Sequence, residues 1–177
     1  VKRYYEGHEM VYRRLSAEGA DCWGGDDFDN VHNLIDAPEH QKKISELRTA
    51  LRNKQLELRD SGLLPEKMRE RRAAANNMTI YEMVRDDKLY PLESYLDAAD
   101  LALARDRANL RTFISWLSNK DEGLRWWAIV GLHLLGADAR RATRKLNAAL
   151  KDESHEVRMM AAWTLIKTGQ QKNALAA

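Results

Sequence analysis

The sequence predicts an all-α protein built from helical hairpins that end in a stacked pair of repeats. Three observations lead to this fold class: an apolar stripe at helical spacing, residues that start and stop helices, and an internal repeat in the last third of the chain. The 177 residues are 44% apolar, which is enough to bury a core.

The first strong helix signal covers residues 38–61. Residues 36–39 (Asp-Ala-Pro-Glu) have the pattern of an N-cap, a first-turn proline and a capping-box glutamate. Gly62 stands where a C-terminal cap belongs, and Pro65 follows as a stop. The apolar residues recur at spacings of three, four and seven, which places them on one helix face: Ile44, Leu47, Leu51 and Leu58.

Shorter signals follow this helix. Thr79 and Glu82 form a second capping-box pattern, and Pro91 precedes a helical stretch from residue 92 to about 107. Residues 1–35 differ from the rest, because Gly and Asp dominate their second half; we expect an irregular N-terminal segment there.

The last third repeats itself at an offset of 33 residues. Residues 116–136 align with residues 149–169, and each copy contains a short helix, a polar turn, a longer apolar helix and a glycine. A period of this length predicts stacked helical hairpins. The matched pairs are Leu117/Leu150, Arg125/Arg158, Ala128/Ala161, Leu132/Leu165 and Gly136/Gly169.

This pattern resembles HEAT repeats, in which an Asp or Asn in the turn and an Arg at the start of the second helix form a ladder between neighbouring repeats. The resemblance implies such structural roles for four residues: Asn119, Arg125, Asp152 and Arg158.

The segment before the repeats resembles the C-terminal end of formylglycine-dependent bacterial sulfatases. The motifs that carry the resemblance stand in the family's order and extend from about residue 33 to 169: Asn33-Leu34-Ile35, Pro38-Glu39, Leu47-Arg48-x-x-Leu51, residues 59–66, residues 81–87, Tyr90-Pro91-Leu92-Glu93 and Leu135–Ala139. Some bacterial sulfatases append HEAT-like repeats in this way. The implied organisation is an irregular remnant of the sulfatase subdomain (1–35), a helical sulfatase-tail region (36–108) and HEAT-like repeats (109–177).

The catalytic residues of that family are missing from this chain. Sulfatases convert a Cys or Ser in a C-x-P-x-R type motif to formylglycine, but Trp-Gly-Gly-Asp follows Cys22 here. The resemblance therefore implies that formylglycine and calcium belong to an upstream catalytic domain, and that the parent protein is periplasmic or secreted. We predict no catalytic residue and no cofactor in this chain.

Other chemistry has little support. Asp26, Asp27 and Asp29 lack the order of a calcium loop, and none of the five histidines has zinc-ligand spacing. The longest apolar run, residues 126–135, is far shorter than the roughly 20 residues that cross a bilayer. A net charge of +2 argues against nucleic acid as the main partner.

Two groups of residues are candidates for an interaction surface. Trp126 and Trp127 lie on a repeat helix, where they either line a partner surface or pack beneath neighbouring helices. A basic stripe could pair with sulfate or phosphate oxygens, so a sulfated glycan is one alternative and a solvated face is the other. The stripe consists of Arg140, Arg141, Arg144 and Lys145.

These observations predict a non-catalytic C-terminal portion of a sulfatase-like hydrolase that acts as an accessory interaction module. Its expected partner is the upstream catalytic domain or another protein. Two alternatives remain at this point: a stand-alone HEAT-type protein-binding scaffold, and a basic repeat module that binds a polyanion or nucleic acid.

Overall fold

The computed structural model describes residues 37–170, and within this range every regular element is a helix. The predicted all-α fold is therefore confirmed for the described part of the chain. The chain divides into two compact units, Val1–Leu51 and Arg52–Ala177, and the division falls inside helix α2 (Gln41–Leu58). The described part of the first unit contains the 3-10 turn Pro38–His40 and the beginning of α2.

Helix α2 confirms the predicted helix but ends earlier. Its last residue is Leu58, and Arg59 adopts a left-handed conformation (φ 55°) directly after it. The Arg59 guanidinium donates to the Val84 carbonyl (2.7 Å) and to Asp87 (2.7 Å), so tertiary contacts hold the chain at this point. The prediction that Gly62 caps the helix was wrong, because Gly62 lies in the following 3-10 turn, Ser61–Leu63.

The start of this region and its apolar stripe also differ from expectation. Ala37 is the N-cap residue and makes no side-chain capping bond, whereas Asp36 lies outside the described residues. No residue of α2 is buried. The stripe is largely exposed: Leu47 at 50%, Leu51 at 61% and Leu58 at 59%.

Three helices of the second unit precede the repeats: α3 (Glu66–Ala75), α4 (Ile80–Met83) and α5 (Leu92–Leu103). The predicted capping box opens α4, since the Glu82 amide donates to Thr79 and the Glu82 carboxylate accepts from the Thr79 amide (2.8 Å). Helix α5 stops short of residue 107, because Asp106 caps a separate 3-10 turn, Arg107–Asn109, by accepting from the Ala108 amide.

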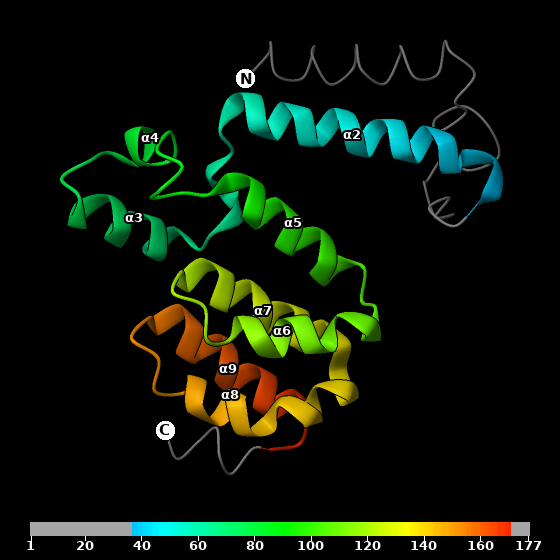
Figure 1. Cartoon of the computed structure of the whole chain (residues 1–177), viewed down its shortest axis with the longest axis vertical. Coiled ribbons are helices and arrows are strands. Elements are labelled where there is room, and N and C mark those ends of the chain that lie inside the picture. Colours follow the sequence, from blue (N-terminus) through cyan, green and yellow to red (C-terminus); the bar gives the residue numbers. More distant parts are fainter. Residues whose placement is uncertain (1–36, 171–177) are drawn as a thin grey trace, which may run out of the picture. The chain divides into compact units, whose positions relative to one another are not determined.

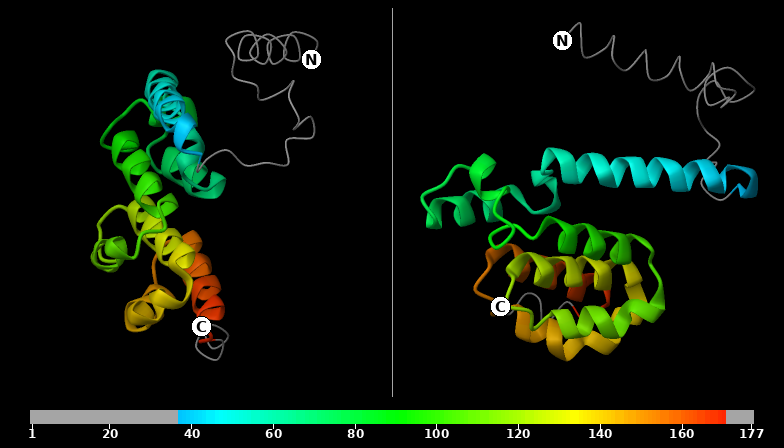
Figure 2. Two further views of the ribbon diagram at one scale, coloured as in Figure 1. Left: turned by 90° about the vertical axis from the view of Figure 1, so that its right-hand side faces the viewer. Right: turned by 45° about the horizontal axis from the view of Figure 1, so that its top comes forward.

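The repeat region forms two hairpins (Figure 1). The first pairs α6 (Leu110–Trp116) with α7 (Glu122–Leu135), and the second pairs α8 (Thr143–Ala149), which follows the 3-10 segment Gly136–Ala142, with α9 (His155–Lys167). Helix α7 packs between α5 and α9. Helices α6 and α8 lie on one side of α7 and α9 (Figure 2, left), so we call α6 and α8 the outer helices and α7 and α9 the inner helices.

Close packing joins the two helices of the first hairpin. Phe113, Ile129 and Leu132 are completely buried between them and their neighbours. Gly131 of α7 faces the Phe113 ring so closely that a Cβ atom at this position would lie 2.6 Å from the ring. The absence of a side chain at Gly131 therefore sets how near α6 approaches α7.

This contact predicts an unusual response to Gly131→Ala. Alanine normally favours a helix over glycine by about 1 kcal/mol, but here its methyl group would push the buried Phe113 ring. We expect a net loss of about 1–3 kcal/mol in the free energy of unfolding, measured by urea denaturation. Ala148→Ser, at an exposed position of α8, serves as the control with a change below about 0.5 kcal/mol. A Gly131→Ala variant as stable as the parent would contradict this account of the packing.

Candidate functional site

The two hairpins meet through charged side chains at the turns between their helices. Arg125, at the start of α7, donates two hydrogen bonds of 2.8 Å to the carboxylate of Asp152 in the second turn. Its Nη1 also donates to the carbonyls of Asn119 (2.9 Å) and Lys120 (3.0 Å) in its own turn. Both Arg125 and Asp152 are nearly buried, with side chains 9% and 11% exposed. The bond from Asp152 raises the pKa of Arg125, although burial acts against this.

The other two residues of the expected ladder make different contacts. The Asn119 side chain accepts from the amide of Asp121 (2.8 Å), so it shapes its own turn. Arg158, the counterpart of Arg125, donates to the carbonyls of Asp152 (2.7 Å) and Glu153 (3.1 Å), and it lies 3.3 Å from His155. No carboxylate of the described residues pairs with Arg158.

An arginine of α3 joins both turns from outside the repeats. Arg71 donates two hydrogen bonds to Glu156 (3.1 and 2.9 Å) at the start of α9, and one to Glu122 (2.7 Å) at the start of α7. Glu156 is buried, which by itself would raise its pKa. Hydrogen bonds from Arg71, from its own backbone amide and from Ser154 reverse this effect and lower the pKa of Glu156 to about 2.

The next residue, Arg72, extends this contact. Its guanidinium donates to the Tyr95 hydroxyl (2.6 Å), to the Leu89 carbonyl (2.8 Å) and to Glu122 (3.3 Å). The Tyr95 hydroxyl in turn lies within hydrogen-bond distance of both oxygens of Asp121 (2.9 and 3.0 Å). Burial and the Asp121 charge raise the pKa of Tyr95, so this phenol stays protonated and donates to the carboxylate. Sequence reasoning missed the α3 contact, because the adjacent arginines gave no sign of partners 50 to 85 residues away.

The tryptophans proposed for an interaction surface are half-buried. Their rings pack edge to face, with an interplanar angle of 77° and centroids 5.0 Å apart. The Trp127 indole N–H donates to the carbonyl of Leu63 (2.8 Å), so Trp127 attaches the segment before α3 to the first repeat. Trp126 also packs against the core. The structure thus places both rings mainly in internal contacts.

The exposed apolar surface of the repeats lies instead on α9. Met159 is 61% exposed, Trp163 60% and Ile166 41%, and spacings of four and three place them on one face of the helix. We call these three residues the α9 face. The sequence could not identify it, because Met159 and Met160 are adjacent and only the packing shows that Met160 is buried.

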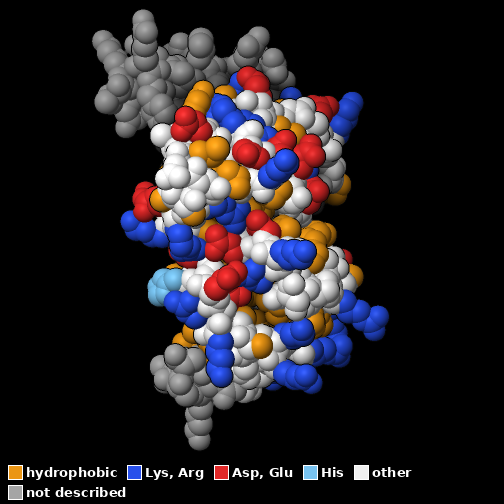
Figure 3. Space-filling view, turned by 60° about the vertical axis from the view of Figure 1, so that its left-hand side comes forward, with side chains coloured by type: hydrophobic (Ala, Val, Ile, Leu, Met, Phe, Trp, Pro, Cys, Tyr) orange, Lys and Arg blue, Asp and Glu red, His pale blue; other side chains and the backbone are white. Residues whose placement is uncertain are grey.

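The basic stripe lies at the surface of the second hairpin. Arg140, Arg141, Arg144 and Lys145 are all exposed. Arg140 donates to the Thr168 carbonyl (3.3 Å) and Lys145 to Ser118 (3.1 Å), whereas the structure gives Arg141 and Arg144 no partner among the described residues. Figure 3 shows Lys and Arg side chains gathered at the lower right of the molecule, whereas the middle of that face mixes both charges.

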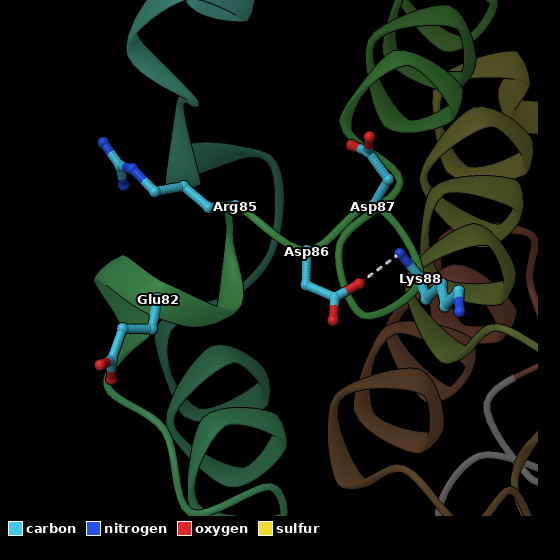
Figure 4. A pocket seen from close by; sticks show the side chains of 5 residues that line it. All are labelled: Glu82, Arg85, Asp86, Asp87 and Lys88. Atoms are coloured by element: carbon cyan, nitrogen blue, oxygen red, sulfur yellow. Dashed lines mark hydrogen bonds between the residues drawn. The ribbon is translucent and has the colours of Figure 1, made fainter.

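One cavity of the described residues lies beside α4 and is lined by charged side chains. This cavity, about 510 Å³ and drawn in Figure 4, is open and lined by Glu82 of α4 and by residues 85–88 of the α4–α5 connection. Its charged groups serve local structure: Glu82 caps α4, Arg85 lies over the Tyr81 ring (3.4 Å), and Asp86 accepts from the Lys88 amide (2.8 Å). In Figure 4 the side chains of Glu82 and Arg85 point away from Lys88.

Two further kinds of feature are absent from residues 37–170. These residues contain no group of three or more His, Cys, Asp or Glu residues placed to hold a metal ion. None of the helices there has the length and apolar character that a membrane span requires. The earlier candidates Cys22, Asp26, Asp27 and Asp29 lie outside the described residues.

Comparison with known families identifies the repeats. Residues 110–177 match the family model for HEAT repeats, so the C-terminal region of the chain is a HEAT repeat region. Comparisons with curated proteins and with solved structures gave no match. The resemblance to sulfatases therefore has no support beyond the motifs that suggested it.

The contacts of Arg125 predict unequal effects for the two matched arginines. Arg125→Gln leaves the carboxylate of Asp152 nearly buried without its partner, so we expect a loss of about 2–4 kcal/mol in the free energy of unfolding. Arg158→Gln removes bonds to backbone carbonyls at a more exposed position and should cost about 1 kcal/mol. Urea denaturation of both variants checks the difference, and equal losses would argue against a special role for Arg125.

The low pKa of Glu156 predicts a pH dependence of stability. The folded pKa of about 2 lies below the ordinary value of 4.5, so this carboxylate stabilises the fold above pH 4.5 and loses that effect as the pH falls toward 2. Arg71→Gln removes the hydrogen bond that contributes most to lowering the pKa of Glu156, so this pKa rises. The variant should therefore be less stable at pH 7 but lose less further stability between pH 4.5 and 2.

Urea midpoints measured across this pH range test the prediction. Lys67→Gln is the control, since Lys67 pairs with Glu70 in an exposed position of the same helix. If the urea midpoints of the parent and Arg71→Gln fall in parallel with pH, the low pKa of Glu156 does not depend on Arg71.

Proposed function

We propose that the chain is a HEAT-type protein-binding scaffold in which the α9 face receives a helical segment of a partner protein. The observation that carries this proposal is the exposed stripe of Met159, Trp163 and Ile166 on an otherwise well-packed repeat helix. Contiguous apolar residues on a surface are typical of interaction sites, and Trp and Met are favoured contact residues there.

The first repeat supports this proposal, because the equivalent positions on its inner helix α7 are partly covered by a neighbouring helix. The counterparts of Met159, Trp163 and Ile166 on α7 are Trp126, Val130 and His133, and all three are partly buried. The His133 ring lies 4.6 Å from the ring of Trp163, so α9 supplies part of that cover. A partner helix on α9 would make contacts of the same kind.

The arginine ladder points to the polar part of this partner. Arg125 takes the Asp152 carboxylate of the neighbouring hairpin, whereas Arg158 has no carboxylate partner among the described residues. A partner that places an acidic side chain beside Arg158 and apolar side chains on the α9 face would reproduce the contact between the two repeats. We include in this proposal a structural role in the ladder between neighbouring repeats for four residues: Asn119, Arg125, Asp152 and Arg158.

A second candidate function keeps the scaffold within a sulfatase-like hydrolase. The observation that favours it is the order of the motifs between Asn33 and Ala139. The module would then cover or extend an upstream catalytic domain that holds the formylglycine and calcium. A C-x-P-x-R motif encoded in frame upstream of Val1 would support this candidate. An upstream sequence without it would exclude this origin.

The scaffold proposal predicts a partner whose binding depends on Trp163. Immobilised protein should retain the partner from an extract of the source organism, and Trp163→Asp should reduce the retained amount about tenfold, the loss expected for one interface anchor. Tyr81→Asp is the matched control, because Tyr81 is an equally exposed aromatic residue (67%) on α4.

Hydrogen exchange of the retained complex should show protection on α9. Equal losses with the two variants, or protection confined to other helices, would contradict the assignment of the α9 face.

A further inference from the structure

The outer helices of both repeats form one basic surface. The offset of 33 residues places Arg107 and Arg111 of the first hairpin at the positions that Arg140 and Arg144 occupy in the second. The basic stripe recognised in the sequence is therefore half of a larger group, which we call the outer basic face. Its members are all exposed: Arg107, Arg111, Arg140, Arg141, Arg144 and Lys145.

The charges of this face are poorly compensated. Residues 107–117 and 136–150 contain these six cations and a single acidic residue, Asp138, which pairs with Arg107 at 3.3 Å. The guanidinium groups of Arg111, Arg141 and Arg144 make no hydrogen bond or ion pair with any described residue. An excess of five positive charges on the two outer helices and the 3-10 segments that precede them, in a chain whose total is +2, creates a local positive potential.

The spacing of these cations matches the spacing of side chains on another helix. Three pairs at i and i+4 each join a 3-10 segment to the first turn of the outer helix that follows it: Arg107 and Arg111, Arg140 and Arg144, and Arg141 and Lys145. Residues at i and i+4 on a helix lie roughly 6 Å apart. The first hairpin supplies one of these pairs and the second supplies two, and α6 contacts the 3-10 segment that contains Arg140 and Arg141. An arginine fork binds a carboxylate through two hydrogen bonds, and acidic residues at i and i+4 would meet it at the same interval.

We propose that the outer basic face binds a short acidic helical segment of a partner protein, with Asp or Glu at i and i+4. The total charge favours a short segment over a long polyanion, since the rest of the chain carries a net negative charge. Two neighbours also favour a protein. Leu103, four residues before Arg107, is 64% exposed and offers an apolar contact, whereas Phe113 is buried and cannot stack on a base.

The outer basic face is separate from the α9 face, so the two proposals can fail independently. The test uses the full chain and a fluorescent 20-residue helical peptide with Glu at i and i+4. Its binding is measured by anisotropy at about 0.1 M salt, where charges separated by more than about 10 Å are screened. Arg111→Gln/Arg141→Gln/Arg144→Gln removes three unpaired cations and should weaken binding about tenfold, the sum of three exposed charge pairs.

A matched variant controls for net charge. Lys42→Gln/Arg48→Gln/Lys88→Gln removes the same charge from exposed side chains elsewhere and should change the affinity less than twofold. Circular dichroism and the unfolding temperature verify that both variants fold, and Trp163→Asp should leave peptide binding unchanged. A 16-base-pair DNA duplex and a heparin octasaccharide are measured in parallel.

Three results would overturn the proposal. In the first, the peptide fails to bind the parent protein at micromolar concentration. In the second, the two triple variants weaken peptide binding equally. In the third, the DNA duplex or the heparin fragment binds more than tenfold tighter than the peptide.

Discussion

Stacking of the two C-terminal hairpins depends on the pair between Arg125 and Asp152. Each partner is almost completely withdrawn from water, so neither ion would be stable there alone. The fork of Arg125 also ties down the carbonyls of its own turn. One side chain therefore closes the first turn and fixes the second hairpin against it. The apolar contacts between α7 and α9 supply the burial, and the ion pair joins the turns of the two hairpins.

The sequence predicted the features that local patterns encode. The hairpins, their turns, the glycines at 136 and 169 and the capping box of α4 follow from spacing and residue type within a few positions. The sequence did not predict features that depend on distant partners. Helix α2 ends at Leu58 rather than near Gly62, because residues of the α4–α5 connection bind the guanidinium of Arg59 directly after it. The apolar stripe of α2 stays exposed.

The candidate site was predicted in the same uneven way. The repeat alignment led to Arg125 and Asp152, which do pair, but also to Trp126 and Trp127, which pack largely inside. Both tryptophans fit a core and an interface equally well by composition. Only the three-dimensional packing distinguishes them from Trp163. The repeat offset extends the basic stripe to Arg107 and Arg111 of the first repeat, and the structure shows that these two side chains are exposed.

The arginines of α3 have a mechanical consequence for the repeats. Helical repeat arrays adjust their curvature by small rotations between neighbouring units. Arg71 donates to Glu122 of the first hairpin and to Glu156 of the second at the same time, so a rotation between the hairpins must break charged hydrogen bonds. We therefore expect the two hairpins to move as one rigid body rather than to flex relative to each other. Binding of a ligand with a complementary surface would therefore cost little conformational entropy of the protein. A ligand with a different shape would have to break these hydrogen bonds to change the angle between the hairpins.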